Sequence, residues 1–188
     1  MGIDSLKRAV FFDRDGVLNA AVIRNGTPHP PASAEEVQID PSAADGIARL
    51  HSLGFLAVVI TNQPDVARGV QRRETVDEIN ALVQQRSNAD ALFTCFHDND
   101  DHCDCRKPKP GLIFQAAAEL GLDVRRSYLI GDRYGDVQAG LSAGCTTVLI
   151  DRGYAETPAE TGAACTVRSL HDALNCIFSL ESEARDEP

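Results

Sequence analysis

The chain has 188 residues and a mass of 20.2 kDa, which suits one globular domain with its own hydrophobic core. Apolar residues make up 43% and charged residues 24%, a composition that argues against a disordered or fibrous protein. The formal net charge of -10 argues against a nucleic-acid partner, because a polyanion is normally bound by a basic face.

Hydrophobicity along the chain also argues against a membrane protein. The longest purely apolar run, Phe55–Ile60, is far too short to span a bilayer. The N-terminal segment has neither a long apolar stretch nor a small-residue cleavage site, so we expect no signal peptide. We therefore expect a cytoplasmic, monomeric protein without a membrane or nucleic-acid partner.

Short apolar runs alternate with helical patterns, which is typical of a Rossmann-like parallel sheet flanked by helices. Runs of Val, Ile, Leu and Phe indicate strands that are buried on both faces. In chain order we expect a strand at Arg8–Phe12, a helix at Ser42–Ser52, a strand at Phe55–Thr61, a helix at Arg73–Gln85, a strand at Ala91–Phe96, a helix at Gly111–Leu120, a strand at Ser127–Ile130, a helix at Asp136–Ala143, strands at Thr146–Ile150 and Ala164–Arg168, and a helix at Leu170–Leu180. This pattern predicts one domain over residues 1–180 and a frayed tail at 181–188.

Two segments do not fit the alternating pattern. Asn19–Asp40 contains three prolines and is too irregular for a regular element; a loop of that length is usually functional. His97–Pro110 contains part of a cysteine cluster. The remaining cysteines, scattered among apolar neighbours, are expected to be small core residues; they are Cys145, Cys165 and Cys176.

The first strand leads directly into two acidic residues, Asp13 and Asp15, followed by Gly16. Ligands of open parallel sheets bind beyond the carboxyl ends of the strands. Residues two apart in an extended segment face the same side, so both carboxylates can converge on a divalent cation that relieves their repulsion. The alternative is a surface motif that caps a turn.

Two further strands end in polar residues. Thr61 and Asn62 could hold a phosphate oxygen, although, taken alone, this pair is better explained by a simple turn. Asp132 follows Gly131 directly after a buried strand, and Asp136 is either a second site acid or an ordinary acid at a helix N-terminus.

The cysteine cluster has metal-ligand spacing. Cys95, His97, Cys103 and Cys105 form a Cys-x-His-x5-Cys-x-Cys pattern, which suits a closed tetrahedral Zn²⁺ site over residues 95–105. Four unconnected loop residues or a disulfide are the alternatives, and His102 is a rival ligand. Zn²⁺ would supply folding energy to a loop with little apolar material and would fix Arg106 and Lys107, which follow the last cysteine.

Taken together, these motifs resemble those of the haloacid dehalogenase superfamily of phosphatases. The matching residues are Asp13-Arg14-Asp15-Gly16, Thr61-Asn62, Lys107 before Pro108, and Gly131-Asp132 with Asp136, within residues 8–153. The resemblance implies this superfamily's fold, without a large cap domain.

The resemblance also implies site roles. Asp13 would be the nucleophile and Asp15 the general acid and base. Mg²⁺ would bind Asp13, the Asp15 carbonyl and Asp132, with Asp136 nearby. Catalysis would also use Thr61 and Lys107, and substrate would contact Thr61, Asn62, Gln63, Arg106, Lys107 and Arg133.

The zinc loop narrows the resemblance to a branch with heptose bisphosphate and histidinol-phosphate phosphatases. The Ala67-Arg68-Gly69 segment resembles the heptose members, which implies removal of the 7-phosphate of D-glycero-D-manno-heptose 1,7-bisphosphate. Segment Ala20–Arg24 does not resemble the substrate loop of those members. Arg106 is the first candidate to bind the second phosphate of such a substrate. Arg24, Arg68 and Arg133 are either further candidates or ordinary solvated arginines. The alternatives are a histidinol-phosphate phosphatase and a zinc-stabilised phosphate-binding module without turnover.

Overall fold

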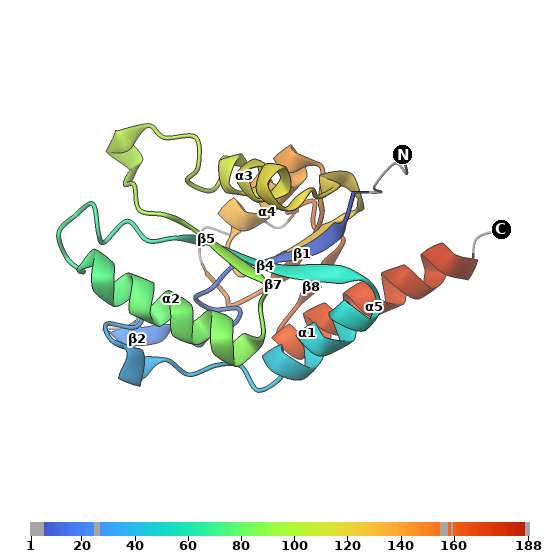
Figure 1. Ribbon diagram of the computed structural model, residues 1–188, viewed down its shortest axis with the longest axis horizontal. Helices are drawn as coiled ribbons and strands as arrows, with labels where there is room; N and C mark the ends of the chain where they lie inside the picture. The colour runs from blue at the N-terminus through green and yellow to red at the C-terminus, as the bar shows by residue number, and fades with distance from the viewer. Residues whose placement is uncertain (1–5, 25–26, 155–157, 159, 187–188) are drawn as a thin grey trace.

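The computed structural model describes residues 6–24, 27–154, 158 and 160–186. Its centre is a parallel six-stranded sheet in the order β5-β4-β1-β6-β7-β8 (Figure 1). Every expected strand is present, with its ends within one residue of the expected ones. The strands are β1 (Arg8–Phe12), β4 (Phe55–Asn62), β5 (Ala91–Cys95), β6 (Tyr128–Gly131), β7 (Thr146–Ile150) and β8 (Cys165–Val167).

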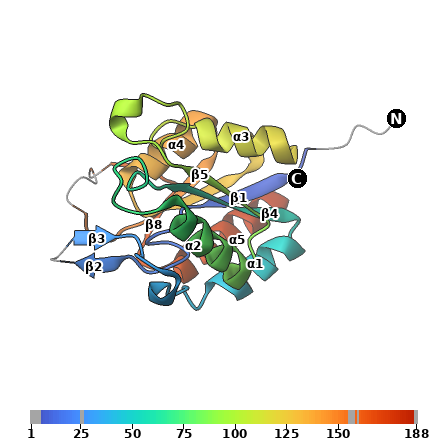
Figure 2. The ribbon, with the colours of Figure 1, turned by 60° about the vertical axis from the view of Figure 1, so that its left-hand side comes forward.

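Helices cover both faces of the sheet, as Figures 1 and 2 show. On one face lie α1 (Ala43–Ser52), α2 (Arg73–Ser87) and α5 (Leu170–Asp186), and on the other α3 (Gly111–Leu120) and α4 (Tyr134–Ala143). Strand β1 shows why the strand sequences are unbroken apolar runs. Val10 and Phe12 pack toward α1, α2 and α5, whereas Ala9 and Phe11 pack toward α3 and α4, so each residue must be apolar.

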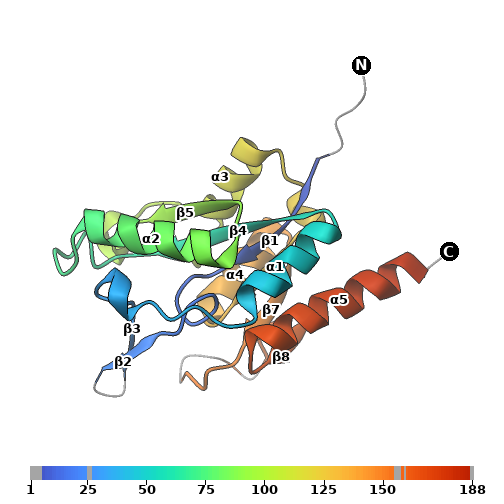
Figure 3. The same cartoon turned by 60° about the horizontal axis from the view of Figure 1, so that its bottom comes forward.

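The C-terminal helix extends beyond its expected end. The tail that we expected to fray from residue 181 continues α5 to Asp186, along the side of the molecule (Figure 3). Glu181 is buried at 7% exposure and accepts hydrogen bonds of 2.8 Å from the Tyr128 hydroxyl and from Arg8. This buried carboxylate joins α5 to β1 and β6.

The expectation that Asn19–Asp40 lacks regular structure is wrong. The segment forms an antiparallel hairpin of β2 (Val22–Arg24) and β3 (Thr27–His29), followed by a 3-10 turn, η1 (Ala34–Glu36). Figure 2 shows the hairpin at one end of the molecule, beyond the carboxyl ends of the central strands. Two other 3-10 turns are η2 (Asn99–Asp101) and η3 (Val124–Arg126).

The scattered cysteines differ from one another. Cys145 is buried, as expected, and burial raises the pKa of its thiol to about 12. Cys165 in β8 and Cys176 in α5 pack against the core, as expected, but they are also joined in a disulfide, which the sequence pattern did not predict. The sequence pattern missed this pair because only the packing of α5 against β8 brings the two together.

No helix in the described part of the chain is both long enough and apolar enough to cross a membrane.

Candidate active site

Three acidic side chains meet at the carboxyl ends of neighbouring strands. Phe12 of β1 pairs with Ile130 of β6, so Asp13 and Asp132 emerge beside each other. Asp136, in the first turn of α4, joins them. One carboxylate oxygen from each of the three acids lies within 4.8 Å of the others. The structure therefore brings together three of the acids that the sequence indicated.

Two glycines permit this close approach. Gly16 has a φ of +84°, and a Cβ on it would collide with the carboxylate of Asp132. A Cβ on Gly131 would collide in the same way with Asp136. The glycine in each motif is therefore needed for space next to an acid.

The acid cluster carries excess negative charge in a buried place. Burial, together with the charges of Asp13 and Asp136, raises the pKa of Asp132 to about 8. Burial also raises the pKa of Asp13 to about 6, although Lys107 opposes the shift. Oδ1 of Asp132 is buried and has no hydrogen-bond partner among the described residues. Converging carboxylates with a spare oxygen suit a hard divalent cation, which would lower these pKa values.

Lys107 supplies the positive charge of this site. Its Nζ lies 2.7 Å from Oδ1 of Asp13 and 2.6 Å from Oδ1 of Asp136, and it donates to the Ile60 carbonyl at 3.0 Å. Burial alone would lower the pKa of Lys107, but the two carboxylates raise it. The side chain of Asn62 exchanges hydrogen bonds of 3.0 and 3.1 Å with the backbone of Lys107. Asn62 thereby holds the loop that carries the lysine.

Asp15 lies outside the acid cluster. Its carboxylate accepts hydrogen bonds from Arg14 at 2.8 Å, Asn19 at 3.0 Å and Gln63 at 2.8 Å. Burial would raise the pKa of Asp15, but the Arg14 charge and these bonds lower it. Gln63 also donates to Oγ1 of Thr61 at 2.9 Å, so Thr61 borders the same group.

Sequence reasoning missed the residues that support Asp15. Arg14 is fully buried and donates to Oδ1 of Asn80 at 2.6 Å. Asn80 stands on the core-facing side of α2 and donates in turn to Thr94 at 3.0 Å. Its place among the apolar residues Val76, Ile79 and Val83 on the buried stripe of α2 is the signal that could have indicated it.

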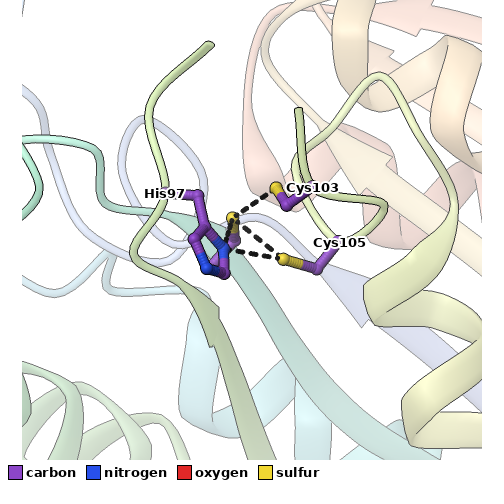
Figure 4. A group of neighbouring side chains, drawn as sticks. His97, Cys103 and Cys105 are labelled. Carbon is purple, nitrogen blue, oxygen red and sulfur yellow. Dashed lines mark hydrogen bonds between the residues drawn. The ribbon is translucent and has the colours of Figure 1, made fainter. Parts of the chain in front are cut away.

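The cysteine cluster converges as expected (Figure 4). Nδ1 of His97 lies 3.2 Å from Sγ of Cys105, and Sγ of Cys95 lies 3.2 Å from Cys105 and 3.7 Å from Cys103. Four ligand atoms within 4.8 Å of one another suit a tetrahedral Zn²⁺ ion. His102 is outside this group and ends η2 with a φ of +49°.

A cavity of about 700 Å³ opens above the acid cluster. Its arginines come from three different segments, and the β3 side of the hairpin forms another wall. Arg24 is not among the lining residues and pairs with Glu36 at 2.7 Å. Tyr154, which the sequence did not indicate, lines the cavity and donates to Oδ2 of Asp132 at 3.0 Å. The lining includes Arg68, Arg106, Arg133, Pro28, His29 and Pro30.

Comparisons with known proteins show the family to which this chain is similar. A family model described as HAD-hydrolase-like matches residues 104–173. The D-glycero-beta-D-manno-heptose-1,7-bisphosphate 7-phosphatase of Pasteurella multocida (strain Pm70) is 34% identical over 192 residues, covering 94% of this chain and 100% of that protein. The protein of the same name from Escherichia coli (strain K12) is 32% identical over 191 residues, covering 94% and 97%.

A solved structure shows the same architecture. It is the D,D-heptose 1.7-bisphosphate phosphatase from B. bronchiseptica, complexed with magnesium and phosphate. Its TM-score is 0.76 at 28% identity, and the match covers 93% of this chain and 99% of that one.

Proposed function

The chain belongs to the haloacid dehalogenase-like family of phosphatases that includes these heptose bisphosphate phosphatases, and we propose that it removes the 7-phosphate of D-glycero-D-manno-heptose 1,7-bisphosphate. The observation that carries the proposal is the position of Asp13, at the floor of a cavity of about 700 Å³ and 2.7 Å from Lys107. Arg106 in the cavity lining suits a substrate with a second phosphate.

In the proposed reaction, a carboxylate oxygen of Asp13 attacks phosphorus, and the bond from phosphorus to the sugar oxygen breaks. Asp15 gives its proton to the leaving sugar oxygen and then, as a carboxylate, takes a proton from water. That water attacks the aspartyl-phosphate, which releases inorganic phosphate and restores Asp13. A phosphate dianion near Asp15 raises its pKa by repulsion, which favours the protonated form needed first.

The remaining site residues hold the phosphate or offset its negative charge. Lys107 neutralises part of the negative charge that gathers when phosphate meets Asp13. Thr61 and the Asn62 backbone lie at the end of β4, where they can hold phosphate oxygens. Asp13, Asp132, Asp136 and the Asp15 carbonyl would hold Mg²⁺, which offsets phosphate charge when bound.

Zn²⁺ is proposed as a structural ion on the four ligands of the 95–105 loop. Cys105 directly precedes Arg106 and Lys107, so fixing the loop fixes both cations. Arg106 is proposed to bind the phosphate that is not hydrolysed, with Gln63 and Arg133 as further substrate contacts.

Phosphate release from two substrates tests the proposal. With Mg²⁺ present, we expect kcat/KM for heptose 1,7-bisphosphate to exceed that for histidinol phosphate by at least about 100-fold, because only the bisphosphate places an anion on Arg106. Asp13→Asn should abolish release from both. Faster hydrolysis of histidinol phosphate would reassign the substrate, and release from neither would reject the phosphatase.

A further inference from the structure

Two cavity-lining arginines have different kinds of partner. Arg68, between β4 and α2, donates from Nε and Nη2 to the two carboxylate oxygens of Asp98, at 2.7 and 2.6 Å. It also pairs with Asp65 at 3.3 Å. Two carboxylates therefore compensate the charge of Arg68, so this residue is poorly suited to attract an anion.

Arg106 is held by neutral acceptors. Its Nε donates to Oδ1 of Asn99 at 2.8 Å, and its Nη1 donates to the His97 carbonyl at 3.5 Å. No carboxylate of the described residues lies within ion-pair distance of it, although its charge helps to lower the pKa of the nearby Asp98, which pairs with Arg68. Because Asn99 occupies Nε, N–H groups remain along the Nη1–Nη2 edge, the geometry that binds phosphate through two parallel hydrogen bonds.

The short turn η2 and the residue before it provide the side-chain acceptors of both arginines. Asp98 precedes η2, and its carboxylate accepts from the backbone N–H of Asn99 at 2.8 Å. The charged side chain of Asp98 thus binds Arg68, and the neutral side chain of Asn99 binds Arg106. A carboxylate in place of Asn99 would orient Arg106 equally well but would cancel its charge.

We propose that Asn99 is a positioning residue that directs Arg106 into the cavity without placing a carboxylate on its guanidinium group, and so selects a substrate with a second phosphate. This inference rests on the proposed function. It assigns substrate selection to a residue of the 95–105 loop that is neither a metal ligand nor part of the cavity lining.

Steady-state kinetics of the metal-loaded enzyme with two matched substrates test the inference. The substrates are heptose 1,7-bisphosphate and heptose 7-phosphate, which is the same sugar without the second phosphate. We expect Asn99→Ala to raise KM for the bisphosphate about tenfold, with kcat changed less than about twofold. KM for heptose 7-phosphate should stay the same. Asn99→Asp should also raise KM for the bisphosphate alone.

Three controls separate positioning from loop damage. Asp100→Ala, in the same turn, should leave both substrates unaffected. Zinc content should equal that of wild type in every variant. In an Arg106→Ala background, Asn99→Ala should have no further effect, because its influence passes through Arg106.

The possible results have distinct meanings. An unchanged KM for the bisphosphate in Asn99→Ala would overturn the inference, as would equal weakening of both substrates. An unchanged KM for the bisphosphate in Asn99→Asp would overturn the claim that the neutrality of Asn99 matters for substrate selection. If wild type hydrolyses neither sugar phosphate, the proposed function fails and the inference fails with it.

Discussion

The ammonium group of Lys107 lies 2.7 Å from a carboxylate oxygen of Asp13, although 94 residues separate them in the chain. Their side chains are only 5% and 12% exposed, so the pair is shielded from solvent. Asp136 shares the same ammonium group at 2.6 Å. A buried cation that serves two carboxylates is costly to remove, because each acid then keeps an uncompensated charge.

We expect Lys107→Met to lower the free energy of unfolding by about 3 kcal/mol without Mg²⁺, because two buried carboxylates lose their counter-charge. Added Mg²⁺ should recover part of that loss. Urea unfolding with and without Mg²⁺ measures both effects. Lys109→Met, which removes a half-exposed lysine from the same loop, should change stability by less than about 0.5 kcal/mol. Equal losses in the two variants would contradict the role of the buried pair.

Asp15→Ala should reduce kcat about 1,000-fold, because the leaving oxygen and the attacking water lose their proton carrier. Mg²⁺ affinity, measured by calorimetric titration, should change little, since the Asp15 backbone carbonyl remains. The buried Arg14 keeps Asn80 but loses its carboxylate partner, so we also expect a stability loss of about 2 kcal/mol. A fall in Mg²⁺ affinity as large as the fall in kcat would show that the side chain itself binds the ion.

Tyr154→Phe should weaken Mg²⁺ binding about tenfold, because the hydroxyl that orients Asp132 is removed while the ring remains. Calorimetric titration with Mg²⁺ checks this expectation. Tyr134→Phe, which removes another hydroxyl from the cavity lining, is the matched control and should leave the affinity unchanged. Identical affinities in the two variants would show that the Tyr154 hydrogen bond does not orient the ligand.

Cys103→Ser should reduce bound zinc to well below one ion per chain and weaken substrate binding, because the loop that carries Arg106 and Lys107 loses a ligand. Elemental analysis and KM measure the two effects. Cys145→Ala removes a buried thiol outside the loop and should retain the zinc. Loss of zinc without any change in KM would separate the metal from substrate binding.

Cys176→Ala should lower the free energy of unfolding by about 3 kcal/mol under oxidising conditions, the entropic effect expected for closing a short loop. The bridged residues are 11 apart in sequence. Activity should not change, because the bridge joins β8 to α5 and borders no part of the cavity lining. Unfolding of wild type with and without reductant gives the comparison, and equal stability in both would show that the disulfide does not form in solution.

The strands and the acid cluster were predictable because each depends on local pattern. Buried parallel strands need unbroken apolar runs, and the acids that follow β1 and β6 meet because those strands are neighbours. The zinc ligands were predictable because most of their spacing lies within one short loop. In both cases the residue type and its position in the pattern determine the contact.

Contacts that depend on tertiary packing were not predictable. Tyr154 reaches Asp132, and Asn80 reaches Arg14, only after the elements assemble. The disulfide between Cys165 and Cys176 likewise needs α5 to lie against β8. The β2–β3 hairpin was missed because Pro28 and the shortness of the strands conceal the alternation that normally indicates a hairpin.

Through the buried carboxylate of Glu181, the C-terminal helix contributes hydrogen bonds to the central sheet. Tyr128 and Arg8, its two donors, belong to the strands that carry Asp132 and Asp13. A version truncated at Leu180 would leave the Tyr128 hydroxyl without this acceptor and Arg8 without its carboxylate partner, next to the strands that lead to the catalytic acids. Engineered shortening or fusion at this terminus should therefore spare the final helix turns through residue 181.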